Sequence, residues 1–393
     1  MSHLDRLTPL VWARQILCEP SVFRILAAGM FALFPLRSFA DSDDGNRFLP
    51  RMLVSSTIPA NGDVNPYGIA FVPSGFSAGG PLNPGDILVS NFNSNINNKN
   101  LQGTGTTIIK LTPSKGAEPD MQAQVFFQGK PPLGFTLALG VLRRGFVIAG
   151  NVTTSDGTSA TVKAGPLLFI DKSGALVGQL ASTPTNKLNG PWGLALKDNF
   201  DRAQLFVSNV LDGTVSRFDL TVSDTKVVAI NPTQIASGYT HRTDPAALVV
   251  GPAGLLYDAL ADILYVASTA DNAIFAVSGA GSANGLSGKG KVVFADHHLR
   301  GPIALALAPN GDLIASNGDA VNADPAHPSE IVEFTKNGRF IGEYNIHQNE
   351  GGAFGVAISE MDEERGNREF DKGTLAVVND NANNVAVTTL ILQ

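Results

Sequence analysis

The chain has 393 residues, of which 44% are hydrophobic and 16% are charged, and its formal net charge is -7. This amount of apolar material is enough for a large core and excludes a disordered chain. Because the chain is acidic and has no cluster of Lys and Arg, we exclude nucleic acid and anionic membrane surfaces as partners. The 41 Gly and 23 Pro residues exceed average usage, which is typical of many short strands joined by tight turns.

The first forty residues have the organisation of a secretory signal peptide. An uncharged apolar run occupies residues 25–36, and Ser38-Phe39-Ala40 places small residues at two positions of a cleavage site. The run is too short to span a bilayer, which needs about 20 apolar residues. We therefore expect an extracytoplasmic protein, periplasmic or secreted, without a membrane span in its mature form. Two features are atypical of a signal peptide: the leader is long, and Arg37 lies between the apolar run and the expected cleavage site. The alternatives are an uncleaved membrane anchor and a start codon placed too far upstream. The only cysteine, Cys18, lies in this leader, so the mature fold would contain no disulfide.

After the leader, one short phrase recurs every fifty to sixty residues. It reads GPWGLAL at 190–196, and related strings are NPYGIAF at 65–71, DPAALVV at 244–250, GPIALAL at 301–307 and GAFGVAI at 352–358. Aligned on a small residue, the chain has six copies, at Gly68, Gly134, Gly193, Ala247, Ala304 and Gly355. Each starts an apolar run that is typical of a buried strand. A small residue there would let the innermost strands of six sheets converge.

A second apolar phrase follows each copy of the first and ends in a polar residue, which is Asn in five copies and Ser268 in the sixth. A third and, in most units, a fourth strand follow before the next copy. Four strands per unit, six units and this period predict an all-β fold, a six-bladed β-propeller with four-stranded blades. We expect one domain over 41–393, with blades that start near 65, 132, 190, 244, 301 and 352.

The sixth unit has only three strands before the chain ends. The segment 47–58, which contains Arg51-Met52-Leu53-Val54-Ser55-Ser56, lies ahead of the first unit and is apolar enough to form a strand. We expect it to pair with the last blade as the fourth strand. This pairing would close the ring and remove the open edge between the first and last blades.

The start of each first strand and the end of each second strand are expected at one rim of the central channel. The residues of this rim are the candidate ligand-binding residues: Asn65, Tyr67, Asn91, Asn151, Trp192, Asn209, His241, Asp244, Ser268, His298, Asn317, Asp319, His347, Asn379 and Asp380. The first interpretation of the asparagines is turn formation, and that of the aromatic residues is packing between adjacent blades. The alternative is that some of these side chains point into the channel and bind a polar ligand or a cation.

A metal site at this rim is a weaker hypothesis. Asn151, Asn209, Asp244 and Asp319 offer hard oxygen ligands that suit Ca²⁺ or another divalent cation, although no cofactor is certain. Asp-Gly and Asn-Gly pairs on the same loops are also ordinary hairpin turns. His241, His298 and His347 are expected on this rim and are relevant to zinc or acid–base chemistry, but no His-x-His spacing supports them.

The aligned repeats resemble the NHL and YVTN class of β-propellers. The strings LFVSNVLDGTVSRFD (205–219) and LYVASTADNAIFAV (264–277) carry this resemblance, which covers roughly residues 47–393. A more distant resemblance is to gluconolactonase-like and strictosidine-synthase-like six-bladed enzymes. The resemblance implies the architecture more than an activity, because propellers include both enzymes and binding proteins. Gluconolactonase-like enzymes place a metal-binding Glu where an inner strand starts, and the corresponding positions here contain no Glu.

The sequence therefore favours a non-catalytic binding module that holds a protein or a small polar ligand on its loop-rich channel face. The longest loops of that face are expected at Asn91–Thr107 and Asp319–Ser329. The alternative is a metal-dependent hydrolase or lyase at the channel mouth, with catalytic residues that the sequence does not identify. Convergence of two or more carboxylates or histidines at the rim would favour the enzyme. The sequence does not indicate an oligomeric state.

Overall fold

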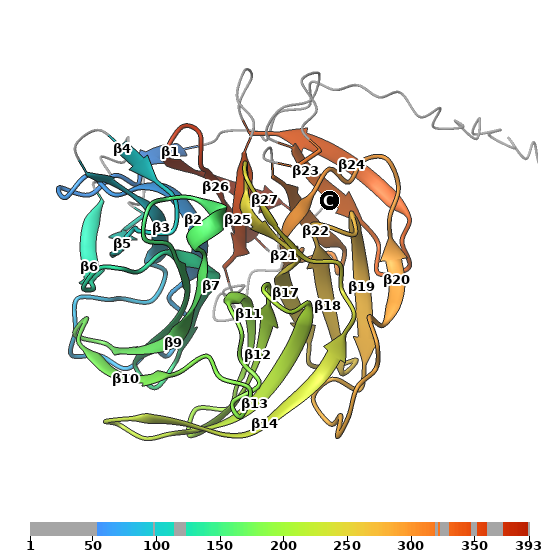
Figure 1. Cartoon of the computed structure of the whole chain (residues 1–393), viewed down its shortest axis with the longest axis horizontal. Helices are drawn as coiled ribbons and strands as arrows, with labels where there is room; N and C mark the ends of the chain where they lie inside the picture. Colours follow the sequence, from blue (N-terminus) through green and yellow to red (C-terminus); the bar gives the residue numbers. More distant parts are fainter. Residues whose placement is uncertain are drawn as a thin grey trace, which may run out of the picture. The chain divides into compact units, whose positions relative to one another are not determined.

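A computed structural model describes residues 53–96, 99–113, 123–318, 321–322, 330–346, 352–359 and 372–391. The chain divides into a unit up to Asp43, which lies outside the described residues, and a unit from Asp44 to Gln393. The second unit is a ring of antiparallel sheets around a central axis (Figure 1). Within the described residues, no helix has the length and apolar character needed to cross a membrane.

The first three blades follow one another in chain order, each with its innermost strand first. Blade 1 contains β2 (Val64–Phe71), β3 (Ile87–Ile96), β5 (Thr107–Leu111) and β6 (Gln124–Gln128), and the short β4 (Lys99–Leu101) pairs with β3. Blade 2 contains β7 (Phe135–Leu142), β8 (Phe146–Thr153), β9 (Lys163–Asp171) and β10 (Leu176–Leu180), with a 3₁₀ turn η1 (Ser159–Thr161). Blade 3 contains β11 (Pro191–Asp198), β12 (Arg202–Asn209), β13 (Thr214–Val222) and β14 (Val227–Ser237).

A separate hairpin precedes the last three blades. It consists of β15 (Arg242–Asp244) and β16 (Leu248–Val250). Blade 4 contains β17 (Pro252–Asp258), β18 (Ile263–Ser268), β19 (Ala273–Ser278) and β20 (Lys291–Phe294). Blade 5 contains β21 (Pro302–Leu307), β22 (Leu313–Asn317), β23 (Glu330–Phe334) and β24 (Phe340–Asn345), and blade 6 contains β25 (Ala353–Ile358), β26 (Lys372–Asn379), β27 (Asn384–Ile391) and β1 (Leu53–Ser56). The prediction of six four-stranded blades is confirmed.

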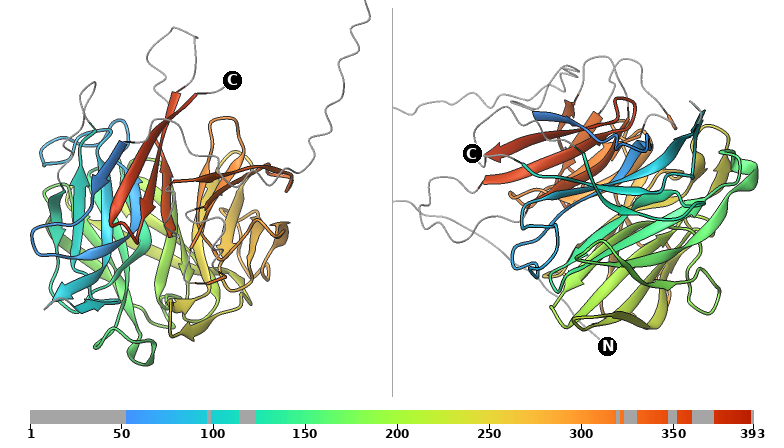
Figure 2. Two further views of the ribbon diagram at one scale, coloured as in Figure 1. Left: turned by 90° about the horizontal axis from the view of Figure 1, so that it is seen from above. Right: turned by 90° about the vertical axis from the view of Figure 1, so that its left-hand side faces the viewer.

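The ring closes as expected, because β1 is the outer strand of the last blade (Figure 2). It runs antiparallel to β27, with Leu53 opposite Val387 and Ser56 opposite Asn384. Just beyond the strand, the Thr57 N–H donates to the Asn383 carbonyl oxygen at 2.9 Å. The first and last strands of the chain are therefore joined in one sheet.

Two of the six predicted repeat positions are wrong. The string 244–250 does not start blade 4 but forms the hairpin β15–β16, and the inner strand begins at Pro252. The equivalent small residue is Gly254, where an added Cβ would lie 2.5 Å from the Ala304 Cα of blade 5. The hairpin string resembles an inner strand in composition, and only the packing of neighbouring blades distinguishes the two.

Blade 2 contains the second misplaced position. In blade 2, Leu139 pairs with Ala149 in the way that Ile69 pairs with Val89 in blade 1. The residue before each first partner is therefore equivalent, so Ala138 corresponds to Gly68. Gly134 precedes the strand, in a backbone conformation with φ of 151°. The irregular pairing between Phe135 and Leu139 shifts the repeat relative to the other blades, and a fixed spacing from Pro cannot reveal such a shift.

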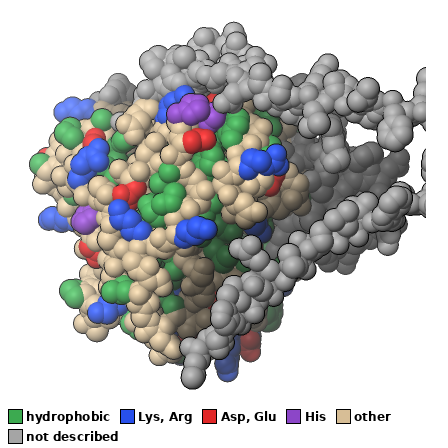
Figure 3. Space-filling model, turned by 90° about the vertical axis from the view of Figure 1, so that its right-hand side faces the viewer, with side chains coloured by type: hydrophobic (Ala, Val, Ile, Leu, Met, Phe, Trp, Pro, Cys, Tyr) green, Lys and Arg blue, Asp and Glu red, His purple; other side chains and the backbone are tan. Residues whose placement is uncertain are grey.

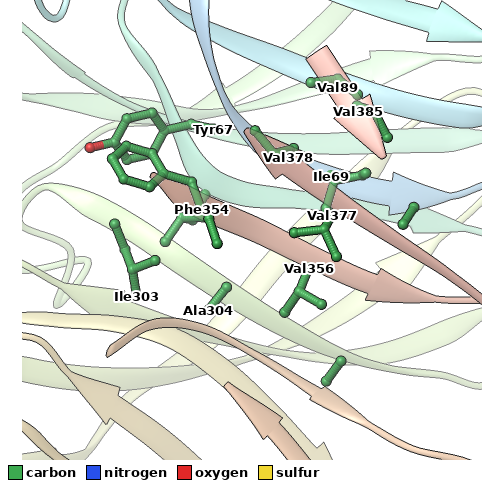
Figure 4. Close-up of a cluster of buried hydrophobic side chains, with 14 of the residues drawn as sticks. Tyr67, Ile69, Val89, Ile303, Ala304, Phe354, Val356, Val377, Val378 and Val385 are labelled. Carbon is green, nitrogen blue, oxygen red and sulfur yellow. The ribbon is translucent and has the colours of Figure 1, made fainter. Parts of the chain in front are cut away.

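The hydrophobic core lies in the wedges between neighbouring blades and around the channel mouth. Four clusters fill the wedges from blades 1 and 2 round to blades 4 and 5. A fifth cluster joins blades 5, 6 and 1 and extends to the centre, where Tyr67 and Phe354 lie against each other above Ile303 (Figure 4). This fifth cluster contains the aromatic residues that lie at the predicted ligand-binding rim of the channel.

Candidate functional site at the channel mouth

The central channel is narrow, and its described lining is apolar. Its cavity of about 60 Å³ is bounded by one or two residues from every blade: Ile69, Leu137, Leu139, Gly193, Leu194, Gly254, Leu255, Ala304, Leu305, Gly355 and Val356. None of these described residues carries a carboxylate, an imidazole or another group that binds a metal. The described lining of the channel therefore consists of packing residues from all six blades.

Four aromatic residues close the channel at the rim where the candidate residues were expected. The ring centroid of Tyr67 lies 4.5 Å from that of Phe354, 5.7 Å from that of Trp192 and 4.8 Å from that of Phe92. These residues come from blades 1, 3 and 6, so the aromatic residues pack across the channel, and not only between adjacent blades as expected. Trp192 is only 2% exposed. An aromatic cluster this buried contributes to stability, and within the described residues it leaves only a small cavity at the mouth.

The hairpin β15–β16 covers this aromatic cluster from outside. Leu248 and Val249 belong to the same apolar core as Trp192, and a cavity of about 20 Å³ remains between the hairpin and the aromatic residues. The Gln102 Nε2 group of blade 1 donates to the Ala246 carbonyl oxygen of the hairpin at 3.1 Å. The Thr154 hydroxyl of blade 2 donates to the Gln102 carbonyl oxygen at 2.6 Å. The loop of blade 1 is therefore bonded to the hairpin, and the loop of blade 2 is bonded to that loop. We call residues 99–105, 154–163 and 242–250 the mouth platform.

The polar residues that end the second strands are buried and hydrogen-bonded within the fold. These are Asn91, Asn151, Asn209, Ser268, Asn317 and Asn379. Asn209 is the clearest case: its Oδ1 accepts from the Asn189 N–H, and its Nδ2 donates to the Lys187 carbonyl and to the Thr214 and Ser216 hydroxyls. In the same way, Asn317 accepts from the Arg300 N–H and donates to the His298 carbonyl. These contacts support the interpretation that the asparagines fasten turns.

The other candidate residues do not form one group. Asn65 has φ of 57° and donates its N–H to Asn383 Oδ1, and the Asp380 N–H donates to the Gly352 carbonyl. His241 is exposed, and its Nδ1 lies 3.2 Å from the Tyr239 carbonyl oxygen. Asp319 and His347 lie outside the described residues.

Asp244 is occupied by its own turn. Its Oδ1 accepts from the N–H groups of Ala246 and Ala247 at 3.0 and 3.1 Å. Burial alone would raise the pKa of Asp244, but these hydrogen bonds and the nearby Arg242 outweigh it and lower the pKa below the usual value. Among the described residues, Asp244 does not share a three-residue ligand group with any other carboxylate or imidazole. Asp244 therefore serves its own turn, while the predicted metal set of Asn151, Asn209, Asp244 and Asp319 stays a prediction, with Asp319 outside the described residues.

Two residues outside the predicted set also hold the rim together. Asn383 Oδ1 accepts from the Asn65 N–H at 2.6 Å, and Asn272 Oδ1 accepts from the Gly301 N–H at 2.7 Å. Both lie in the turn between the second and third strands with φ of 52° and 51°, a conformation that Asn tolerates. Each links its blade to the start of the next blade around the ring. In the sequence, the signal that could have indicated these two linking residues is an Asn directly before the third strand of a blade.

Asp271 fastens the segment that leads into the hairpin. Its carboxylate accepts hydrogen bonds from the Thr240 N–H at 3.1 Å, the Thr240 hydroxyl at 2.6 Å and the Ser268 hydroxyl at 2.7 Å. The Lys289 ammonium group lies 2.7 Å from the same carboxylate. Burial alone would raise the pKa of Asp271, but the bonds from Lys289, Thr240 and Ser268 together lower it.

The variant Asp271→Asn is expected to melt at a lower temperature than the unchanged protein at pH 7, with a smaller difference below pH 4. A carboxyl whose pKa is lower in the folded state stabilises the fold above its unfolded pKa of about 3.9, and this contribution is lost as the pH falls further. Thermal melts of both proteins between pH 7 and pH 3 test this. Asp224→Asn, in an exposed pair with Arg144, is the control. A difference that does not change with pH would contradict the assignment.

Among the comparisons with known proteins, one superposition supports the fold. No protein-family model and no curated protein matches the sequence. A solved structure from Thermus thermophilus, named for a glucose dehydrogenase, superposes with a TM-score of 0.51 at 11% identity, over 86% of this chain and 100% of its own. A structure named for a gluconolactonase gives a TM-score of 0.49 at 14% identity, over 88% of this chain and 95% of its own. The calcium-binding protein regucalcin from Agrobacterium tumefaciens gives 0.48 at 11% identity, over 86% of this chain and 94% of its own.

The sheet topology defines the class of the protein, and the superposition on the glucose dehydrogenase structure agrees with it. The chain is a six-bladed β-propeller, as the repeats predicted. At such low identities the resemblance carries no activity over to this chain. The function must be argued from its own residues.

Proposed function

We propose that this protein is a non-catalytic binding module that holds a protein partner on the mouth platform. The observation that carries the proposal is the closed mouth. The hairpin β15–β16 and the aromatic cluster fill the position where a propeller enzyme would need an open cavity. A face without a cavity is better suited to a macromolecular surface than to a small molecule, because small-molecule sites are concave. An extracytoplasmic location, expected from the leader, is part of the proposal.

The platform has the properties of a prepared contact surface. Its exposed side chains include Lys99, Asn100, Lys163, Arg242 and Thr243, which offer charge and hydrogen-bonding groups. The bonds that join its loops hold the backbone in place before a partner arrives. A preordered surface loses less conformational entropy on binding than a mobile one. We infer that the partner presents a polar surface to these groups.

The alternative hydrolase or lyase would need acids, bases or metal ligands that converge on the mouth. The described amides of the rim bond to backbone and hydroxyl groups of the fold, and the described channel lining is apolar. The proposal also needs no calcium, since Asp244 is engaged in its own turn. These observations favour binding over catalysis.

Two measurements test the proposal. The first is hydrolysis of glucono-δ-lactone by the purified protein with Ca²⁺, Mg²⁺, Mn²⁺ or Zn²⁺, where we expect the rate of buffer alone. A saturable rate that a chelator abolishes would overturn the non-catalytic assignment.

The second measurement is photo-crosslinking in the expressing cells from an unnatural side chain at Thr243, on the platform. The matched control is Thr225, in the turn between β13 and β14 at the opposite end of blade 3. We expect a discrete cross-linked product from position 243 and not from position 225. Equal products from both positions, or none from position 243, would contradict the proposed surface.

A further inference from the structure

We propose that Asp296, His297 and His298 bind one transition-metal ion, with Zn²⁺ as the best match. Among the described residues, this is the one group of three His, Cys, Asp or Glu side chains whose ligand atoms all lie within 4.8 Å of one another. The group follows β20 and precedes β21, so it lies where the chain passes from blade 4 to blade 5. Figure 3 shows histidine and acidic side chains at the surface of the side that carries these blades. The inference does not depend on the proposed partner-binding function.

One distance in the group is close to that between neighbouring ligands of a zinc site. Asp296 Oδ1 lies 3.0 Å from His298 Nδ1. With Zn–N and Zn–O bonds near 2.0–2.2 Å and tetrahedral geometry, neighbouring ligand atoms are about 3.3 Å apart. Asp296 and His298 thus already span one edge of the coordination tetrahedron. The exposed His297 offers the third ligand atom, within 4.8 Å of the other two.

One imidazole of the group is held firmly before any metal arrives. The His298 ring is buried and stacks on Phe340, with centroids 3.7 Å apart and planes inclined by 11°. The backbone of His298 is held as well: its carbonyl oxygen accepts a hydrogen bond from Asn317 Nδ2, and its backbone N–H donates to Asp296 Oδ1. Ligands fixed by neighbouring packing and hydrogen bonds bind metal more tightly, because little ordering remains to be done.

The chemistry of the donors selects the ion. Two imidazole nitrogens and one carboxylate oxygen match zinc sites with three protein ligands and an open position. Calcium instead takes six to eight oxygen ligands, which this group does not offer. A metal here would link the outer end of blade 4 to the start of blade 5, next to the rim contact between His298 and Asn317.

The contacts of Asp296 also fit a simple turn cap, since its carboxylate accepts the His298 N–H. The test therefore needs variants that separate a cap from a ligand. His297→Ala removes an exposed ligand outside the cap. Asp296→Asn keeps an oxygen that can accept the N–H but removes the charge that favours a cation. His241→Ala removes another exposed loop histidine and is the matched control.

The experiment is calorimetric titration of Zn²⁺ into metal-free protein purified without a polyhistidine tag, together with thermal melts and the absorption spectrum of the Co²⁺-loaded form. We expect one Zn²⁺ per chain, a rise in melting temperature of about 5 °C at 100-fold excess over Kd, and no binding of Ca²⁺. His297→Ala is expected to weaken Zn²⁺ binding about 100-fold, Asp296→Asn about 10-fold, and His241→Ala not at all. Failure of the unchanged protein to bind Zn²⁺, or equal binding by the His297→Ala variant, would overturn the proposal.

Discussion

Replacing Gly193 with valine is expected to lower the free energy of unfolding by more than about 3 kcal/mol, the upper end of ordinary overpacking costs. A Cβ at this position would overlap the Ala253 carbonyl oxygen of blade 4. The collision is with backbone, which cannot move aside as a side chain does. The same spot carries a hydrogen-bond relay, in which the Gly193 N–H donates to Ser208 Oγ at 2.8 Å and Ser208 Oγ donates to the Ala253 carbonyl at 2.6 Å. Separating the two inner strands would break this relay as well.

Gly285→Val is the matched control for this substitution. Gly285 does not lie in the left-handed region, and a Cβ there would have no heavy atom within 4 Å. We expect its free energy of unfolding to stay within about 0.5 kcal/mol of the original. Urea denaturation followed by circular dichroism measures both variants. If both variants lower the free energy of unfolding by the same amount, blades 3 and 4 do not approach each other closely at Gly193.

Replacing Ser55 with proline is expected to open the ring at its closing strand and to lower the melting temperature by about 5 °C. β1 has only four residues, and each ladder bond to β27 is a large part of what holds it. The Thr57 N–H bonds to the Asn383 carbonyl, and alternation along an antiparallel pair places the Ser55 N–H on the same side, toward β27. Proline removes that donor. A loss of about 3 kcal/mol corresponds to roughly this shift, because the unfolding entropy of a unit from Asp44 to Gln393 is large and the shift per kcal/mol is therefore small.

Val54→Pro supplies the control within the same strand. Val54 is 55% exposed, and its N–H is expected to point away from β27, where an edge strand tolerates proline. We expect a shift of about 1 °C or less, with no change in oligomeric state. Size-exclusion chromatography with light scattering should show association of the Ser55→Pro variant, because a released β1 exposes the edge of β27. Equal behaviour of the two prolines would show that β1 does not close the ring by pairing Ser55 with Val385.

The candidate site shows where reasoning from sequence stops. The asparagine positions follow from the repeat, because the pattern of apolar runs fixes where each second strand ends. The hydrogen-bond partners of their side-chain amides do not follow from the repeat. Asn209 bonds to Lys187, which precedes its own blade, and Asn383 bonds to Asn65 at the other end of the chain. Partners this distant in sequence are determined only when the blades are packed. The aromatic cluster is similar, since Tyr67 and Trp192 lie in blades 1 and 3 and meet only across the channel.

The sequence by itself determined the number of blades, their four-stranded form and the closing pair of β1 with β27. These features depend on local properties, namely short apolar runs that recur every fifty to sixty residues, turn residues and a count of strands that leaves one edge to be filled. Only the tertiary structure decided that residues 244–250 form a hairpin over the mouth, that the mouth is closed, and that Asp296 lies beside His298. The physical reason is that an apolar run next to proline has the same local preference in an inner strand as in a covering hairpin. Contacts with neighbouring blades distinguish the two arrangements, and a single sequence does not contain those contacts.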